Sequence, residues 1–211
     1  MTNKKYKIKE IFYSIQGEGY HAGRPAIFIR FSGCNLWNGK EQGRDKAICK
    51  FCDTDFVGTD GQNGGVYTAN QLVNKILNIS SDFNCRFLVF TGGEPLLQFD
   101  NELLKSLKEN ELYVAMETNG TLKAIKGIDW LTVSPKSGAN FMQKSGDEIK
   151  IVYPQDNLDP VKYLNLNFKH FYLQPKDDFN QKENIAKTLE YCLAHPKWRL
   201  SMQLHKILGV D

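Results

Sequence analysis

The sequence lacks any apolar run long enough to cross a membrane. Apolar runs such as Phe87-Leu88-Val89-Phe90 have the length of a β-strand, whereas a spanning helix needs about 20 apolar residues. The charged N-terminus is not followed by an apolar stretch, so the sequence predicts no signal peptide. We therefore expect a cytoplasmic protein without a membrane partner.

The chain also has little excess charge of either sign. It carries 27 Lys and Arg against 24 Asp and Glu, which gives a net charge of +3. Proteins that bind nucleic acid usually cluster their basic residues, but here they are scattered, apart from a run at Lys4, Lys5, Lys7 and Lys9. We interpret this run as a solvated edge and expect no nucleic-acid partner.

Repeats, low-complexity tracts and linkers rich in Pro, Gly and Ser are missing as well. A hydrophobic fraction of 41% over 211 residues suffices for one sizeable core, so we expect a single domain spanning residues 1–211. The one long irregular stretch, residues 34–67, is rich in Gly, Asn, Lys and Asp. Loops of this length are uncommon in compact domains unless they are functional, so we expect this one to carry binding residues.

Short apolar runs alternate with helical patterns along the rest of the chain. The expected strands are Ala26–Ser32, Arg86–Thr91, Leu112–Thr118, Trp130–Ser134, Glu148–Tyr153 and Phe171–Gln174. Expected helices follow a capping box at Thr68 and Gln71, a cap at Asp100, the segment opened by Asn180 and Glu183, and Asp159-Pro160. The third of these helices should bury a face formed by Ile185, Ala186, Leu189, Cys192 and Leu193.

This alternation predicts an α/β fold with a mostly parallel sheet and right-handed crossovers. About six strands are too few for a complete eight-stranded barrel. We therefore expect an open, partial (β/α) barrel with few helices.

Chemistry-bearing residues follow the ends of these strands. The segments are Gly33-Cys34-Asn35, Thr91-Gly92-Gly93-Glu94-Pro95, Glu117-Thr118-Asn119-Gly120, Ser134-Pro135-Lys136 and Gln174-Pro175-Lys176-Asp177. Since α/β sheets gather their sites at the carboxyl ends of their strands, we expect these segments to form one site.

Three of the five cysteines belong to the irregular loop, in the pattern Cys34, fourteen residues, then Cys49-Lys50-Phe51-Cys52. In a reducing compartment free thiols favour metal binding over disulfides. Three thiolates can hold three irons of a cubane cluster and leave the fourth iron open. A structural zinc ion would want a fourth ligand, which His21 or His205 would supply. On the cysteines alone, cluster and zinc remain equally open.

The glycine-rich segment Thr91–Pro95 favours the cluster. Glycine lets a backbone approach a ligand closely, and carbonyls exposed on such a turn can accept hydrogen bonds from an ammonium group. The bland alternative is an ordinary strand-to-helix turn with Glu94 as a solvated residue.

Taken together, Gly92-Gly93-Glu94-Pro95 and the upstream Cys-x-aromatic-Cys pair resemble the radical S-adenosylmethionine (SAM) superfamily. The superfamily usually spaces its cysteines as Cys-x-x-x-Cys-x-x-Cys, and this chain departs from that rule. Its longer spacing resembles the 7-carboxy-7-deazaguanine synthase family. The segments that carry this resemblance are Phe12–Gly19, Arg24-Pro25, Phe28–Trp37, Phe51–Phe56 and Arg199–Lys206.

The resemblance implies conversion of 6-carboxy-5,6,7,8-tetrahydropterin to 7-carboxy-7-deazaguanine with loss of ammonia, a lyase reaction that feeds queuosine and other deazapurines. It implies a 4Fe–4S cluster, SAM and Mg²⁺ as cofactors. It also implies a reducing electron donor such as flavodoxin or ferredoxin, and a homodimer.

Residue roles follow from the resemblance by matching position. The cluster ligands would be Cys34, Cys49 and Cys52, and Thr54 would bind Mg²⁺. SAM would contact Phe51, Cys52, Asp53, Gly93, Ser134, Pro135, Lys136, Gln174, Pro175, Lys176 and Asp177. The pterin would contact Ile15, Gln16, Gly17, Arg30, Thr91, Glu117, Asn119, His205 and the terminal Asp211. Beyond the cofactors, Glu117 is the one candidate catalytic residue.

Several residues favour a structural role. Cys85 and Cys192 are expected to be buried thiols, and Trp37 and Trp198 to be packing residues. His205 fits either a core network or the edge of the substrate.

Two other functions remain open at this point. One is a radical SAM activase that installs a glycyl radical on a partner protein, although the usual cysteine spacing of activases is absent. The other is a non-enzymatic, zinc-stabilised interaction domain.

Overall fold

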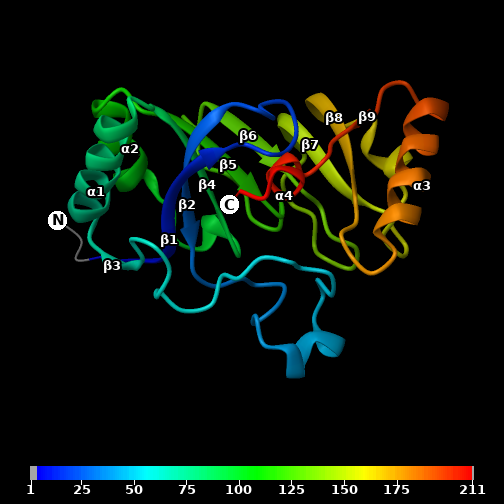
Figure 1. Ribbon diagram of the computed structural model, residues 1–211, viewed down its shortest axis with the longest axis horizontal. Helices are drawn as coiled ribbons and strands as arrows, with labels where there is room; N and C mark the ends of the chain where they lie inside the picture. Colours follow the sequence, from blue (N-terminus) through cyan, green and yellow to red (C-terminus); the bar gives the residue numbers. More distant parts are fainter. Residues whose placement is uncertain (1–3, 211) are drawn as a thin grey trace.

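The computed structural model describes residues 4–210, which contain one nine-stranded sheet of order β3-β1-β2-β4-β5-β6-β7-β8-β9. Strands β2 and β4 to β9 run parallel in chain order (Figure 1). They include β2 (Pro25–Phe31), β4 (Phe87–Gly92), β5 (Tyr113–Thr118), β6 (Trp130–Val133), β7 (Ser145–Tyr153) and β8 (Asn167–Pro175). All six expected strands are therefore confirmed, and the sheet is mostly parallel.

Three further strands escaped the sequence patterns. Strands β1 (Tyr6–Ile15) and β3 (Gly65–Tyr67) pair antiparallel at one edge, and β9 (Arg199–Leu200) lies at the other. Strand β1 carries Lys7, Lys9 and Glu10 among its apolar residues, so it lacks the continuous apolar run from which the other strands were predicted. Strand β9 has only two residues, too few to show any period.

The middle of the sheet forms the core because its strands are covered on both faces. Phe87, Leu88, Val89 and Phe90 of β4 are at most 3% exposed, and helices pack over the sheet on its outer side. Figure 1 shows α1 (Ala69–Phe83) and α2 (Asn101–Glu109) over one end of the sheet and α3 (Gln181–Ala194) over the other.

The expected helix caps are present. Thr68 Oγ1 accepts from the backbone N–H of Gln71, whose side chain accepts from Thr68 N, so the capping box closes. Asp100 accepts from Leu103 N at 3.0 Å and also from the hydroxyl of Tyr6 at 2.8 Å, which ties α2 to β1.

The remaining helical segments are short. They are the 3-10 turns η1 (Glu41–Lys46), η2 (Pro95–Leu97) and η3 (Pro160–Tyr163), and helix α4 (Leu204–Leu208). The helix expected at Asp159-Pro160 forms only η3, and α4 was not predicted. Among residues 4–210, no helix combines the length and apolar character needed to span a bilayer.

The buried face of α3 is not the one the apolar pattern predicts. Leu189 is 44% and Leu193 75% exposed, whereas Asn184, Thr188 and Cys192 are buried. Asn184 donates to the carbonyl oxygen of Lys176 at 2.9 Å, and Thr188 donates to Asn184 O at 2.6 Å. Of these two bonds, only that of Asn184 joins the helix to the segment after β8, while Thr188 bonds within the helix and also lies 3.4 Å from Tyr153 O at the end of β7. Hydrogen bonds to the neighbouring strand ends therefore orient the helix in place of the apolar face.

This orientation predicts how two leucines contribute to stability. Leu193→Ala should change the free energy of unfolding by less than about 0.5 kcal/mol because the side chain is exposed. Leu107→Ala, at a fully buried position on α2, should cost about 2–5 kcal/mol. Urea denaturation of the metal-free proteins measures both, and a large loss at Leu193 would contradict the helix orientation.

Candidate active site

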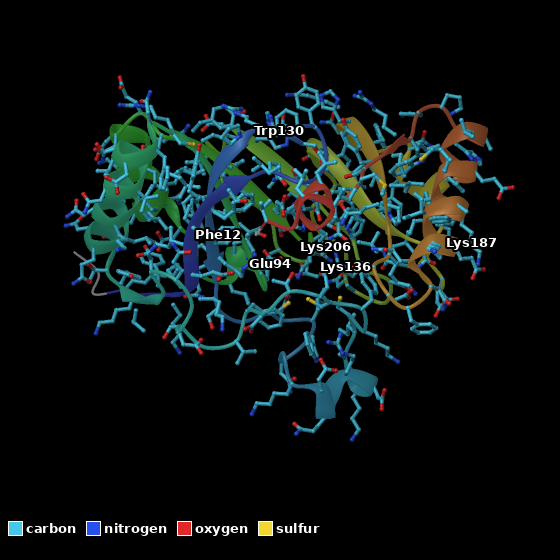
Figure 2. The ribbon with its side chains drawn as sticks, viewed as in Figure 1. Phe12, Glu94, Trp130, Lys136, Lys187 and Lys206 are labelled. Atoms are coloured by element: carbon cyan, nitrogen blue, oxygen red, sulfur yellow. The ribbon has the colours of Figure 1, made fainter. Side chains whose placement is uncertain are left out.

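One pocket of about 370 Å³ lies at the carboxyl ends of the parallel strands. Its walls come from the strand ends, from the loop after β2 and from α4. Figure 2 shows Glu94, Lys136 and Lys206 near the middle of the molecule, on the same side of the sheet as the loop after β2, while Lys187 lies on the outer surface of α3. The volume is that of an ordinary small-molecule site.

Most of the residues expected from the sequence meet in this pocket. The cysteine, SAM and magnesium candidates that line it are Cys34, Cys49, Phe51, Cys52, Asp53, Thr54, Gly93, Ser134, Lys136, Gln174, Pro175 and Asp177. The substrate candidates that line it are Ile15, Gln16, Gly17, Arg30, Thr91, Glu117, Asn119 and His205.

Two expected residues, Pro135 and Lys176, do not line it. The carbonyl of Pro135 accepts from Gln155, and Lys176 forms an ion pair with Asp178 at 3.1 Å outside the pocket. The backbone N–H of Lys176 also donates to Tyr153 O at 2.8 Å. Asp211 lies outside the described residues.

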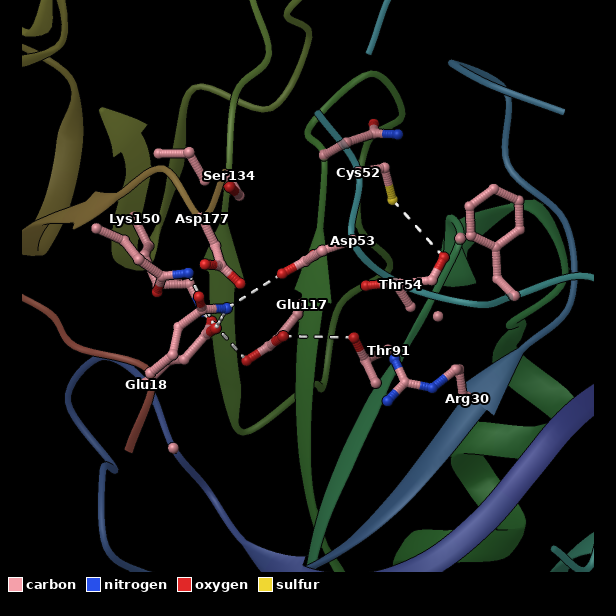
Figure 3. Close-up of a pocket in the computed structure, with 18 of the residues that line it drawn as sticks. Glu18, Arg30, Cys52, Asp53, Thr54, Thr91, Glu117, Ser134, Lys150 and Asp177 are labelled. Carbon is pink, nitrogen blue, oxygen red and sulfur yellow. Dashed lines mark hydrogen bonds and ion pairs between the residues drawn. The ribbon is translucent and has the colours of Figure 1, made fainter. Parts of the chain in front are cut away.

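The thiols of Cys34, Cys49 and Cys52 line one part of the pocket wall. Leu36 N donates to Cys34 Sγ at 3.4 Å, and the thiol of Cys52 lies 3.9 Å from the carbonyl oxygen of Thr54 (Figure 3). Within residues 4–210, no three His, Cys, Asp or Glu side chains gather around one point as the ligands of a single metal ion do. Thiolates of a cubane cluster need no such gathering, because each binds a different iron.

The other cysteines and His21 lie elsewhere. Cys85 and Cys192 are buried in the core at 8% and 9% exposure. His21 packs between the rings of Trp130 and Phe87, with centroid distances of 4.5 and 5.0 Å. Neither a fourth cysteine nor His21 therefore completes the set of three thiols.

The turn after β4 lies against the first cysteine. A Cβ on Gly93 would fall 2.1 Å from Gly33 O and 2.9 Å from the Cβ of Cys34, so only glycine fits. The backbone N–H of Glu94 donates to Gly33 O at 3.0 Å. This close approach aligns the ends of β2 and β4.

Glu94 is buried at the turn, which rules out the alternative that it is a solvated residue. Its carboxylate accepts from Thr118 Oγ1 and from Asn119 N, both at 2.8 Å, and from Leu96 N at 3.0 Å. Burial raises the pKa of Glu94, against the effect of these donors. The side chain joins the end of β4 to the end of β5.

Glu117 occupies the polar end of the pocket. Its Oε1 accepts from Gln16 Nε2 at 3.0 Å and lies 3.5 Å from Lys150 Nζ, while its Oε2 accepts from Thr91 at 3.3 Å (Figure 3). These contacts hold the carboxylate in a fixed orientation where it can accept hydrogen bonds from a ligand.

Two other substrate candidates already have partners. Arg30 donates through Nε to Glu10 at 2.7 Å while its guanidinium lines the pocket beside Thr91 (Figure 3). Asn119 uses its amide for Asn35, at 3.0 Å, and for Thr121. Asn119 therefore organises the turn after β5 in addition to any contact it makes in the pocket.

Glu18 and Lys150 form a buried ion pair beneath Glu117, which the sequence reasoning missed. The side chains are 15% and 5% exposed. Glu18 also accepts from Gln174 and Gln203, each at 2.9 Å. Burial alone would raise the pKa of Glu18, but Lys150 and the amide of Gln203 outweigh it and lower the pKa to about 2. Glu18 therefore stays ionised at neutral pH.

Lys206 is a second missed residue. It forms ion pairs with both Asp53 and Asp177 and so ties α4 to two walls of the pocket. Next to it, Leu204 N donates to Gly17 O at 2.9 Å, and a Cβ on Gly17 would collide with the ring of His205. His205 thus both packs on Gly17 and lines the pocket.

Local signals existed for these missed residues. A lysine at position 150 interrupts an apolar strand, and Glu18 lies in the segment Phe12–Gly19, which carries part of the family resemblance. Nothing in the sequence says that the two side chains meet, because they lie 132 positions apart.

Comparisons with known proteins agree with this arrangement. Residues 45–192 match the model of the radical SAM superfamily. The chain is 50% identical over 207 residues to 7-carboxy-7-deazaguanine synthase from Caulobacter vibrioides, covering 97% of this chain and 99% of that one. It is 49% identical to the protein of the same name from Burkholderia multivorans, with the same coverage. The crystal structure of QueE from Escherichia coli superposes with a TM-score of 0.73 at 28% identity, covering 95% of both chains.

The site predicts one pH effect on stability. Burial raises the pKa of Glu148 from 4.5 to about 7, against the charge of Lys150 and a hydrogen bond from Tyr20 N. Between these values the folded chain holds a proton that the unfolded chain has lost, so the contribution of Glu148 to stability falls as pH rises from 4.5 to 7.

Glu148→Gln cannot ionise, so it should not lose this contribution as pH rises. Its free energy of unfolding, measured relative to that of the parent protein, should therefore increase between pH 5 and pH 8. Unfolding of the metal-free proteins in urea at several pH values measures the difference. Parallel pH profiles for the two proteins would contradict the assignment.

Proposed function

The chain belongs to the 7-carboxy-7-deazaguanine synthase family of radical SAM enzymes, and from this premise we propose how its pocket divides the reaction among its residues. The family makes 7-carboxy-7-deazaguanine from 6-carboxy-5,6,7,8-tetrahydropterin. One observation carries the proposal. A single pocket holds three thiols with a glycine turn at one side and a fixed, polar carboxylate network at the other.

The thiol side fits a 4Fe–4S cluster. Cys34, Cys49 and Cys52 would each bind one iron, which leaves one iron for SAM. The N–H of Leu36 aimed at Cys34 suits an anionic sulfur. When bound, the reduced cluster with SAM supplies the electron and the carbon radical that begin the ring contraction.

The SAM-binding residues would lie between the thiols and α4. The backbone at Gly93 passes close to the cysteine loop without a side chain in the way. Phe51, Asp53, Ser134, Lys136, Gln174, Pro175 and Asp177 line the adjoining walls. Pro135 and Lys176 do not line the pocket, because their polar groups contact Gln155 and Asp178. We therefore propose that they position the neighbouring residues and do not contact SAM directly.

The carboxylate side would hold the pterin. Gln16, Lys150 and Thr91 fix the orientation of the Glu117 carboxylate. In this orientation Glu117 would accept hydrogen bonds from the N–H and amino groups of the pyrimidine edge. Arg30 would pair with the substrate carboxylate through its planar fork of donors. Ile15, Gly17, Asn119 and His205 would border the ring, and Asp211 remains a proposed contact.

Other parts of the proposal rest on the family resemblance. Thr54 would bind Mg²⁺ together with oxygens of substrate and water, because one hydroxyl is a weak ligand. We further propose a single domain with residues 34–67 as its cluster-binding loop, reduction by a flavodoxin or ferredoxin, and a homodimer. The five free thiols suit a reducing, cytoplasmic compartment.

The test is turnover by the anaerobically reconstituted protein. Incubation with a reductant, SAM, Mg²⁺ and the carboxytetrahydropterin should yield a deazapurine that mass spectrometry detects. Cys49→Ala should abolish both the iron content and turnover, because the cluster loses one of its three ligands. Cys192→Ala, which removes a buried thiol outside the pocket, should retain both.

Three outcomes would overturn the proposal. A colourless protein with zinc and without iron or sulfide would favour an interaction domain. Activation of a glycyl-radical partner without deazapurine formation would favour an activase. Full iron content in Cys49→Ala would refute the ligand assignment.

A further inference from the structure

The fourteen residues between Cys34 and Cys49 form a closed excursion rather than an open loop. The carbonyl oxygen of Leu36 accepts from Ile48 N at 3.0 Å and from Cys49 N at 3.3 Å. The chain therefore leaves and returns at Leu36. These two hydrogen bonds bring Cys49 close to the segment that follows Cys34, although fourteen residues separate the two cysteines in the sequence. The rest of the excursion, with η1 at its tip, extends away from the sheet (Figure 1).

Arg44, in η1, reaches back from the excursion to the cysteine turn. Its Nη1 donates to the carbonyl oxygens of Lys50, at 3.0 Å, and Cys52, at 3.1 Å. Its Nε and Nη2 donate to the two carboxylate oxygens of Glu41. One guanidinium therefore bridges η1 and the turn that carries two of the three thiols.

The guanidinium also rests on a fixed aromatic surface. Its central carbon lies 4.0 Å from the ring centre of Trp37, which is 8% exposed. Trp37 meets Phe56 edge-on at 5.6 Å and donates to Lys40 O at 3.3 Å. The wall beneath Arg44 is thus built from residues before Cys49 and after Cys52.

We propose that Arg44 is a positioning residue for the iron–sulfur site, and that the long spacing between the first two cysteines serves to deliver it. It fixes the carbonyls of the turn, so that the thiols of Cys49 and Cys52 stay directed toward the cluster. It also adds a positive charge beside the cluster, which Glu41 balances in part. The inference rests on the proposed function, because it requires that the three cysteines bind a cluster.

Charge and hydrogen-bond geometry can be separated by two substitutions. Arg44→Ala removes both, whereas Arg44→Lys keeps a charge but loses the planar fork. A cation favours the more negative, reduced state of a cluster, so its removal should make the midpoint potential more negative. A role confined to folding would leave the potential unchanged.

The experiment measures two quantities on anaerobically reconstituted proteins, namely the rate of iron release to a chelator and the midpoint potential. Arg44→Ala should release iron at least about tenfold faster, because two charge-assisted hydrogen bonds to the cysteine turn are lost, and should shift the potential downward. Arg44→Lys should also release iron faster but keep a potential near that of the parent protein.

Arg86→Ala is the matched control. Arg86 also pairs with a glutamate, Glu111, and donates to the carbonyl of Asn110 at 3.3 Å, but it is exposed at the amino ends of β4 and β5, far along the chain from the cysteine loop. Both quantities should stay at parent values in this variant.

The outcomes separate the two proposals. If the parent protein takes up no cluster, the proposed function fails and this inference fails with it. If the parent holds a cluster and Arg44→Ala matches it in iron release and potential, only the role of Arg44 is refuted. Far-UV circular dichroism checks that Arg44→Ala folds, and if it does not, Arg44→Lys decides by its iron release rate alone.

Discussion

The close backbone contact between Gly33 and the turn at Gly93 and Glu94 is the constraint on which the site depends. No side chain fits at position 93, and Glu94 N donates to Gly33 O. The buried carboxylate of Glu94 then holds the N–H of Asn119 at the end of the next strand. These contacts join the carboxyl ends of β2, β4 and β5, and Cys34 lies beside them. The long, irregular loop after β2 therefore begins from a fixed position, which also fixes where its first thiol lies.

The two ends of the pocket differ in their charged groups. At one end the thiols lie near the charges of Lys136 and Asp53. At the other, Lys150 lies between Glu18 and Glu117, so one ammonium is shared by two carboxylates. Glu18 stays ionised because of this pairing, which leaves Glu117 oriented by Lys150, Gln16 and Thr91. The second end offers carboxylate acceptors to a ligand with N–H donors, and the first offers three thiols to iron.

Much of this arrangement could be predicted from strand ends and motifs, because parallel strands bring their carboxyl ends to one edge. The apolar run Phe87–Phe90 marked its strand correctly, as did the capping residues Thr68 and Asp100 for their helices. The predicted orientation of α3 was wrong because Asn184 donates to the carbonyl oxygen of Lys176, just after β8, and the apolar pattern of the helix does not show that contact. Glu18, Lys150 and Lys206 were missed for a similar reason, since a buried ion pair is defined only when its two elements have packed.

We propose that three thiolates hold a cluster whose remaining iron binds SAM near Gly93. Electron–nuclear double resonance of the reduced protein with SAM labelled with ¹⁵N at its amino group tests this most directly. The account predicts a ¹⁵N coupling to the cluster that appears when labelled SAM is added and is absent with the unlabelled compound. A reduced cluster whose spectrum does not respond to SAM would contradict it.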